Sequence, residues 1–225
     1  MALLIALQGW LPQGGMSAQD EPEYRMEIGG GLALTAYEGD FNGNLLRQLQ
    51  PMAGAVAKYK MNPRMAWAAS LRYGQLKGSS ANVKTWYPQL AANPIEFTSK
   101  VVDFDIRYEY NFWPFGTGRE YHGAQPFTPF IALGAGIVWA KPGKQVVALQ
   151  TPIGFGVKYK VANRVNLSAE WMMHFSGSDK IDGVKDPYGI KSTGLFKNTD
   201  CYSSLQVTIT YEFMEKCKTC HNDRD

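Results

Sequence analysis

Three residues near the C-terminus have the spacing of a reactive motif. Cys217, Cys220 and His221 form a Cys-x-x-Cys-His pattern, the spacing at which c-type haem is attached to protein. Only Asn222 to Asp225 follow, and no second axial ligand is evident, so no haem pocket can form from the tail. The two cysteines could instead form a disulfide within the tail or with a partner, bind a metal, or stay as free thiols. We favour a disulfide and expect no metal and no other cofactor.

A histidine and a serine two residues apart form a second candidate site, at His174 and Ser176. A base beside a hydroxyl is the arrangement that activates a nucleophile, and this His-x-Ser resembles that of outer-membrane lipid A deacylases. Gly177 and Ser178 follow where that family has asparagine. Both side chains also fall on the polar face of the strand predicted below. We therefore predict a structural histidine in an interior network and no catalytic residues.

Alternation of apolar and polar residues defines the elements that must position these groups. Between Val102 and Phe112 the even positions are apolar and the odd positions are polar or charged, which predicts a strand with two unlike faces. The same rule predicts eight strands, at residues 24–37, 52–61, 64–74, 102–112, 130–139, 152–161, 164–175 and 202–213. An even strand number with alternately tight and long connections is typical of bacterial outer-membrane barrels. The connection 113–125 is long for its position among the tight turns.

Alternation alone does not decide which face is inside, because a lipocalin-type soluble barrel has its apolar face inward. Here the polar face carries small residues, as a narrow eight-stranded interior requires. They are Gly29, Gly31, Gly54, Ala66, Gly134, Gly136, Gly154 and Gly156. The apolar face carries Tyr and Trp near strand ends, which is typical of lipid–water boundaries. We therefore predict an all-β fold, an eight-stranded antiparallel transmembrane β-barrel of the outer-membrane type, in contact with outer-membrane lipid.

Charged residues on the polar face would then line the lumen. They are Arg25, Lys58, Lys60, Arg72, Arg107, Lys158 and Lys160, facing Glu27, Asp103, Asp105, Glu109, Glu170 and Glu212. In a narrow lumen such charges must pair or be hydrated. We predict a lumenal charge network that fills the barrel, with no open pore.

The N-terminal segment predicts export. Residues 2–7 form a short apolar run, followed by small residues and then Asp20, which indicates a cleavable signal peptide over 1–19. The barrel is then expected over 20–213 and a periplasmic tail over 214–225. The net charge is only +3, with no Lys/Arg block or phosphate-binding motif, so we expect no nucleic-acid partner. We also expect no small-molecule substrate.

Cys201 stands apart from the Cys pair of the tail. The predicted last strand separates them, and its twelve or so residues at about 3.3 Å each span some 40 Å of chain. We therefore expect Cys201 to form no bond with the Cys pair of the tail. An odd number of cysteines in an exported protein indicates an intermolecular bond or a free thiol.

Several segments between residues 23 and 213 carry a resemblance to a known family. They are Glu23–Gly31, Tyr59–Arg64, Phe104–Phe112, Pro129–Ile131 and Thr208–Phe213. In these segments the chain resembles the PorG-type outer-membrane barrels of the type IX secretion machinery of Bacteroidetes. The resemblance implies a non-enzymatic secretion component that docks on a periplasmic lipoprotein ring of K- and N-type subunits. We expect that contact at Cys217, Cys220 and His221. The alternatives are an adhesion or membrane-integrity barrel of OmpX type and a lipid A acyl hydrolase.

Overall fold

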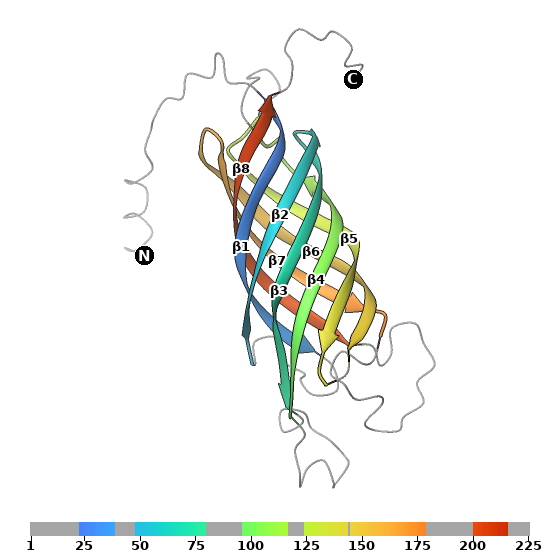
Figure 1. Cartoon of the computed structure of the whole chain (residues 1–225). Helices are drawn as coiled ribbons and strands as arrows, with labels where there is room; N and C mark the ends of the chain where they lie inside the picture. Colours follow the sequence, from blue (N-terminus) through green and yellow to red (C-terminus); the bar gives the residue numbers. More distant parts are fainter. Residues whose placement is uncertain are drawn as a thin grey trace, which may run out of the picture.

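Eight antiparallel strands close into a barrel. The computed structural model describes residues 23–38, 48–79, 96–116, 124–143, 145–178 and 200–215. The strands are β1 (Tyr24–Glu38), β2 (Gln50–Asn62), β3 (Met65–Ser79), β4 (Glu96–Asn111), β5 (Phe127–Lys141), β6 (Val146–Ala162), β7 (Val165–Ser176) and β8 (Cys201–Glu215). Each strand pairs with the next, and β8 pairs with β1, so the predicted fold is confirmed (Figure 1). Nowhere in these six ranges is there a helix long and apolar enough to span a bilayer.

The two rims of the barrel differ. β1 begins and β8 ends at one rim, which we call the terminal end, and there two-residue turns join β2 to β3 and β6 to β7 (Figure 1). The opposite rim, the loop end, carries the connections from β1 to β2, β3 to β4, β5 to β6 and β7 to β8. In outer-membrane barrels the short turns and termini are periplasmic and the long loops extracellular.

Neighbouring residues on β4 show which face is inside. Ile106 is 47% exposed, whereas Arg107 is 1% exposed. The outward row continues with exposed Phe104, while Asp103 and Asp105 are buried. The apolar face therefore points outward, as predicted, and not inward as in a lipocalin-type barrel.

Glycine on β5 allows the interior side chains of β4 to lie close to the barrel wall. Gly134 pairs with Arg107 and Gly136 with Asp105. A Cβ atom on Gly134 would lie 2.6 Å from Arg107 Cβ, and one on Gly136 would lie 2.8 Å from Asp105 Cβ. Both distances are shorter than van der Waals contact, so the charged side chains of β4 occupy the space that these glycines leave.

Strands β3 and β4 extend further toward the loop end than the predicted limits at residues 74 and 102. The pairing continues as far as Ser79 with Glu96. Beyond Tyr73 and Val102, every second residue still points outward. The outward residues there are polar and the inward ones are apolar, which is the opposite of the lipid-facing part. The outward residues Gln75, Lys77, Thr98 and Lys100 are exposed, and the inward residues Leu76, Phe97 and Val101 are buried. The predicted limits rested on apolar residues on the outward face. They therefore mark the end of the lipid-facing surface and not the end of the strands.

Strand β6 also begins earlier than predicted, at Val146 and not at residue 152. Proline lacks a backbone donor and is uncommon inside a strand, yet β6 continues through it. In the structure Pro152 lies buried within β6, opposite His174 of β7.

The interior at the loop end is apolar. Its buried residues form one cluster: Ala33, Tyr37, Met52, Leu76, Phe97, Val101, Val138, Ala140, Ala148 and Tyr202. Tyr37 and Phe97 pack edge to face with ring centroids 4.9 Å apart. The barrel interior therefore has an apolar layer at the loop end and charged layers between it and the terminal end.

The long connection between β4 and β5 is folded against the terminal end in its described parts. The Phe115 amide donates to Pro63 O at 2.9 Å, and the Gln125 amide donates to Pro114 O at 2.7 Å. Phe115 is only 4% exposed. This connection therefore lies across the tight β2–β3 turn and is held by backbone hydrogen bonds.

Candidate functional site

The inward face of β4 carries a column of polar groups, four of them charged. Asp103, Asp105, Arg107, Glu109 and Asn111 follow one another from the loop end toward the terminal end, and all are buried. Alternation of strand side chains places every second residue on the same face. The column therefore runs through most of the barrel, and each member faces side chains of other strands.

Arg72 of β3 binds the two carboxylates of this column that lie nearest the loop end. Its Nη2 lies 3.0 Å from Asp103 Oδ2 and also contacts Asp105 Oδ2. Asp103 accepts two further hydrogen bonds, from Gln150 Nε2 at 2.6 Å and from the Tyr202 hydroxyl. Three other strands thus hold the Asp103 carboxylate in place.

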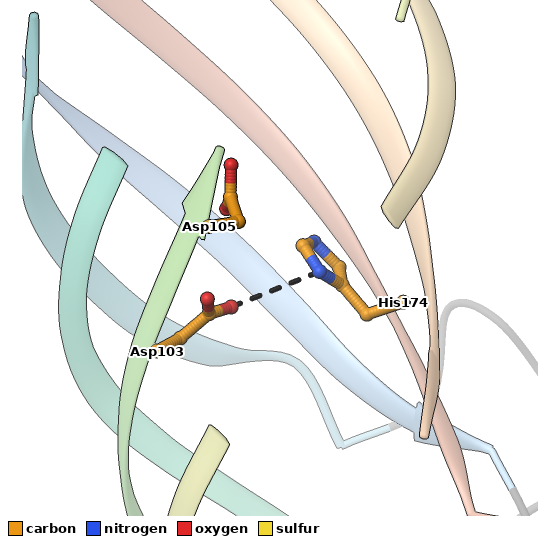
Figure 2. A group of neighbouring side chains, drawn as sticks. All are labelled: Asp103, Asp105 and His174. Carbon is orange, nitrogen blue, oxygen red and sulfur yellow. Dashed lines mark ion pairs between the residues drawn. The ribbon is translucent and has the colours of Figure 1, made fainter. Parts of the chain in front are cut away.

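His174 of β7 lies beside this group (Figure 2). Its ring stacks on Tyr202 with centroids 4.4 Å apart and an interplanar angle of 4°. Its Nε2 is 3.2 Å from Ser204 Oγ, and its Nδ1 is 3.7 Å from Asp103 Oδ2. The histidine is therefore part of the interior network, as its position on the polar face predicts.

The hydroxyl beside His174 is Ser204 and not Ser176. Ser176 Oγ instead accepts a hydrogen bond from the Ser178 amide at 3.1 Å. An acid, an imidazole and a hydroxyl in this order resemble a nucleophile-activating relay. However, His174 is 0% and Ser204 1% exposed, and Arg72 and Tyr202 already bind Asp103. Both side chains are therefore buried in the barrel interior, and the carboxylate beside them already has an arginine and a tyrosine as partners.

Among the residues that the structure describes, Asp103, Asp105 and His174 form a group that could hold a metal ion. Their ligand atoms all lie within 4.8 Å of one another (Figure 2). A metal needs carboxylate lone pairs and repels a nearby cation, but the Arg72 guanidinium contacts an Oδ2 atom of both carboxylates. The donor set therefore fits the arginine that it already binds and does not fit a metal.

Arg107 connects the upper and lower parts of the network. Its Nη2 lies 2.8 Å from Glu170 Oε1 across the barrel on β7, and its Nη1 lies 3.3 Å from Asp105 Oδ1. Its Nε is 3.7 Å from Glu109 Oε1. In the part of the chain that the structure describes, Glu170 has no cationic partner besides Arg107.

Lysines form the layers nearest the terminal end. Lys58 and Lys158 lie 3.1 Å and 2.7 Å from the carboxylate oxygens of Glu109. Lys158 Nζ also lies 4.5 Å from the ring centroid of Phe130, within the range of a cation–π interaction. Lys58 Nζ lies 5.8 Å from the same ring centroid, so the two ammonium groups share both the Glu109 carboxylate and the Phe130 ring.

The layer closest to the terminal end is built around Glu212 of β8. Lys60 and Lys160 lie 2.7 Å and 2.8 Å from its two oxygens, and Asn166 donates to it at 2.8 Å. Lys60 is also 3.6 Å from Glu27. Two lysines from opposite strands thus share one carboxylate.

The structure brings twelve of the thirteen predicted lumenal charges into two ion-paired groups, one of eight charges that includes Arg107 and one of four charges around Glu212. The cations are Lys58, Lys60, Arg72, Arg107, Lys158 and Lys160, and the anions are Glu27, Asp103, Asp105, Glu109, Glu170 and Glu212. Six cations therefore balance six anions. Arg25 is half-buried near the terminal end of β1. The neutral members Gln150, Tyr202 and Ser204 were not predicted, although their positions on the polar faces of β6 and β8 would have placed them here.

Of the three cysteines, the structure describes Cys201 alone. Cys217, Cys220 and His221 lie outside the described residues. Cys201 begins β8 at the loop end, is a free thiol, and donates to Glu38 O at 3.3 Å. The full length of β8 therefore separates Cys201 from the point where the tail begins.

A protein-family model matches residues 25–222, which is most of the chain. The chain belongs to the family described as Domain of unknown function (DUF6089). The match includes all eight strands apart from Tyr24, the first residue of β1, and extends beyond the end of β8. No curated protein matches the chain.

Solved structures of small outer-membrane barrels are similar to this fold. Neisserial surface protein A is 13% identical with a TM-score of 0.51, over 84% of this chain and 97% of that one. Ail, the attachment invasion locus protein of Yersinia pestis, is 12% identical with a TM-score of 0.48, over 85% and 99%. OprG of Pseudomonas aeruginosa is 13% identical with a TM-score of 0.42, over 87% and 98%. This member of the family is an outer-membrane β-barrel.

Proposed function

We propose that this barrel is a non-enzymatic component of a type IX protein-secretion apparatus. In this role it anchors a periplasmic lipoprotein ring, of K- and N-type subunits, to the outer membrane. The resemblance of several segments to PorG-type barrels supports the secretion role. The interior of the barrel supports the structural one.

The single observation that carries the structural role is the self-contained interior network. Twelve charges pair across the lumen, and an apolar layer lies above them at the loop end. Paired charges in a narrow interior hold strands together and offer a passing solute few free groups. The surfaces that remain for function are the two rims and the lipid-facing wall.

We place the partner contact at the terminal end, which is the periplasmic rim in outer-membrane barrels. The described parts of the β4–β5 connection give this rim an ordered protrusion, with Trp113 exposed beside it. β8 ends at Glu215 at the same rim, and Cys217, Cys220 and His221 follow it in the sequence. A thiol bonded to a partner would persist in the oxidising periplasm.

Affinity purification of the full-length protein from detergent-solubilised membranes tests the proposal. We expect periplasmic lipoproteins to co-purify, and we expect a deletion strain to retain its secretion cargo inside the cell. Normal cargo secretion by the deletion strain, with no lipoprotein in the purified fraction, would contradict the proposal.

A further inference from the structure

Three lysines form a cationic patch on the outer wall of the barrel at the loop end. They are Lys77 of β3, Lys100 of β4 and Lys141 of β5, and all three are exposed on the outward face. β1, β2, β6, β7 and β8 carry no outward-facing lysine or arginine along their lengths. We call these three residues the lysine patch.

The register of the strands brings the patch together. Lys100 pairs directly with Lys141 across β4 and β5. Lys100 also pairs with Gln75, and Lys77 pairs with Thr98, so Lys77 lies diagonally from Lys100. Residues directly opposite in a sheet have Cβ atoms about 5 Å apart, and diagonal neighbours are about 7–8 Å apart. The three ammonium groups can therefore reach a single anion.

Within the part of the chain that the structure describes, the charges of the patch are uncompensated. Like charges directly opposite in a sheet are destabilising, yet none of the three lysines forms an ion pair with any residue that the structure describes. Glu96 lies four residues before Lys100 on the same face of β4 and forms no ion pair with the patch either. Such an arrangement is stabilised when an anion from outside the chain lies between the lysines.

The height of the patch identifies the kind of anion. Tyr73, Val102 and Trp139 form one row across β3, β4 and β5, and this is the last row with an apolar outward face. Lys100 and Lys141 lie in the next row. The patch thus begins where the lipid-facing surface ends, and aromatic residues of the preceding row are typical of the headgroup level. The patch therefore lies at the level expected for lipid headgroups, next to a wall that suits acyl chains.

We propose that the lysine patch binds the phosphate groups of lipid A in the outer leaflet. The loop end faces outward in barrels of this kind, and lipid A joins phosphate groups to several acyl chains. The ammonium groups would contact the phosphates, while the wall below Tyr73 and Trp139 contacts the chains. This site is separate from the terminal end, so it stands or falls independently of the secretion role.

Native mass spectrometry of the full-length protein, folded in detergent, tests the site with three lipids. The probes are bisphosphorylated lipid A, the same lipid A after removal of its phosphates, and phosphatidylglycerol. A lysine near a membrane surface contributes about 1 kcal/mol to binding an anionic lipid, so three lysines predict a preference of roughly a hundredfold. Because salt screens exposed charges, we expect a measured preference of at least about tenfold for bisphosphorylated lipid A over either other lipid.

Three variants separate charge from shape. The K77Q/K100Q/K141Q protein should lose the preference for bisphosphorylated lipid A, and K77R/K100R/K141R should keep it. Glu96→Gln removes a charge from the same face and should bind lipid A at least as well as the wild type. Altered gel migration of unheated samples confirms that each variant is folded. Unchanged binding by the glutamine variant, or equal binding of phosphatidylglycerol and lipid A, would overturn the proposal.

Discussion

Removing Arg107 tests the interior network at the point where its upper and lower parts meet. The guanidinium lies 2.8 Å from Glu170 and 3.3 Å from Asp105. After Arg107→Leu, Asp105 keeps its contact with Arg72. Glu170 keeps no cation among the described residues, so the variant leaves one buried carboxylate without a counter-charge.

The expected loss follows from that single uncompensated charge. Breaking a buried ion pair by removing one partner costs about 3–5 kcal/mol, whereas removing both partners together is often close to neutral. Arg107→Leu should therefore lower the free energy of unfolding by about 3–5 kcal/mol. The double variant Arg107→Leu/Glu170→Gln should recover most of this loss. Urea titration of the protein in lipid vesicles, followed by tryptophan fluorescence, measures both values.

The double-mutant cycle gives the refuting result. Contacting residues in one network show coupling energies of about 0.5–3 kcal/mol, and distant residues are additive. If Arg107→Leu changes the free energy of unfolding by less than about 1 kcal/mol, or if the two substitutions are additive, Arg107 and Glu170 are not a buried pair. The lumen would then be hydrated enough to screen its charges.

Four further results are expected. Ile106→Lys, on the lipid-facing neighbour of Arg107, should cost about 2–4 kcal/mol in the same urea titration. Gly134→Ala should cost about 1–3 kcal/mol, because the added methyl group meets β4, whereas Gly143→Ala has open space and should change little. On a non-reducing gel a higher-mass band should disappear in a variant that lacks the two tail cysteines and persist in Cys201→Ser. Mass spectrometry should show lipid A with unchanged acyl chains in a deletion strain; extra acyl chains there would indicate a hydrolase.

The lipid-spanning part of the fold was predictable from the sequence because one rule governs it. From Val102 to Tyr110 every second side chain faces lipid and must be apolar, so period-two alternation marks the strand. Above this level the outward face meets water, and Lys100 and Thr98 take the outward positions. A rule built on lipid contact cannot follow a strand beyond the lipid, which is why β3 and β4 were predicted too short.

The sequence predicted which charged residues face the lumen, but it did not predict which of them contact each other. Alternation assigned Arg107 and Glu170 to one face, but it could not show that they meet across the barrel. That contact depends on strand register and on the closure of β8 against β1. For the same reason the sequence pointed to Ser176 as the neighbour of His174, whereas the adjacent strand brings Ser204 to it.

Site-specific photocrosslinking in intact cells tests the proposed scaffold role most directly. A photoreactive residue in place of Arg164 lies at the terminal end, and one in place of Lys141 lies at the loop end. We predict crosslinks from position 164 to periplasmic lipoproteins of the secretion apparatus, and none to them from position 141. Crosslinks to those lipoproteins from position 141 alone, or none from either position in cells that secrete normally, would contradict the account.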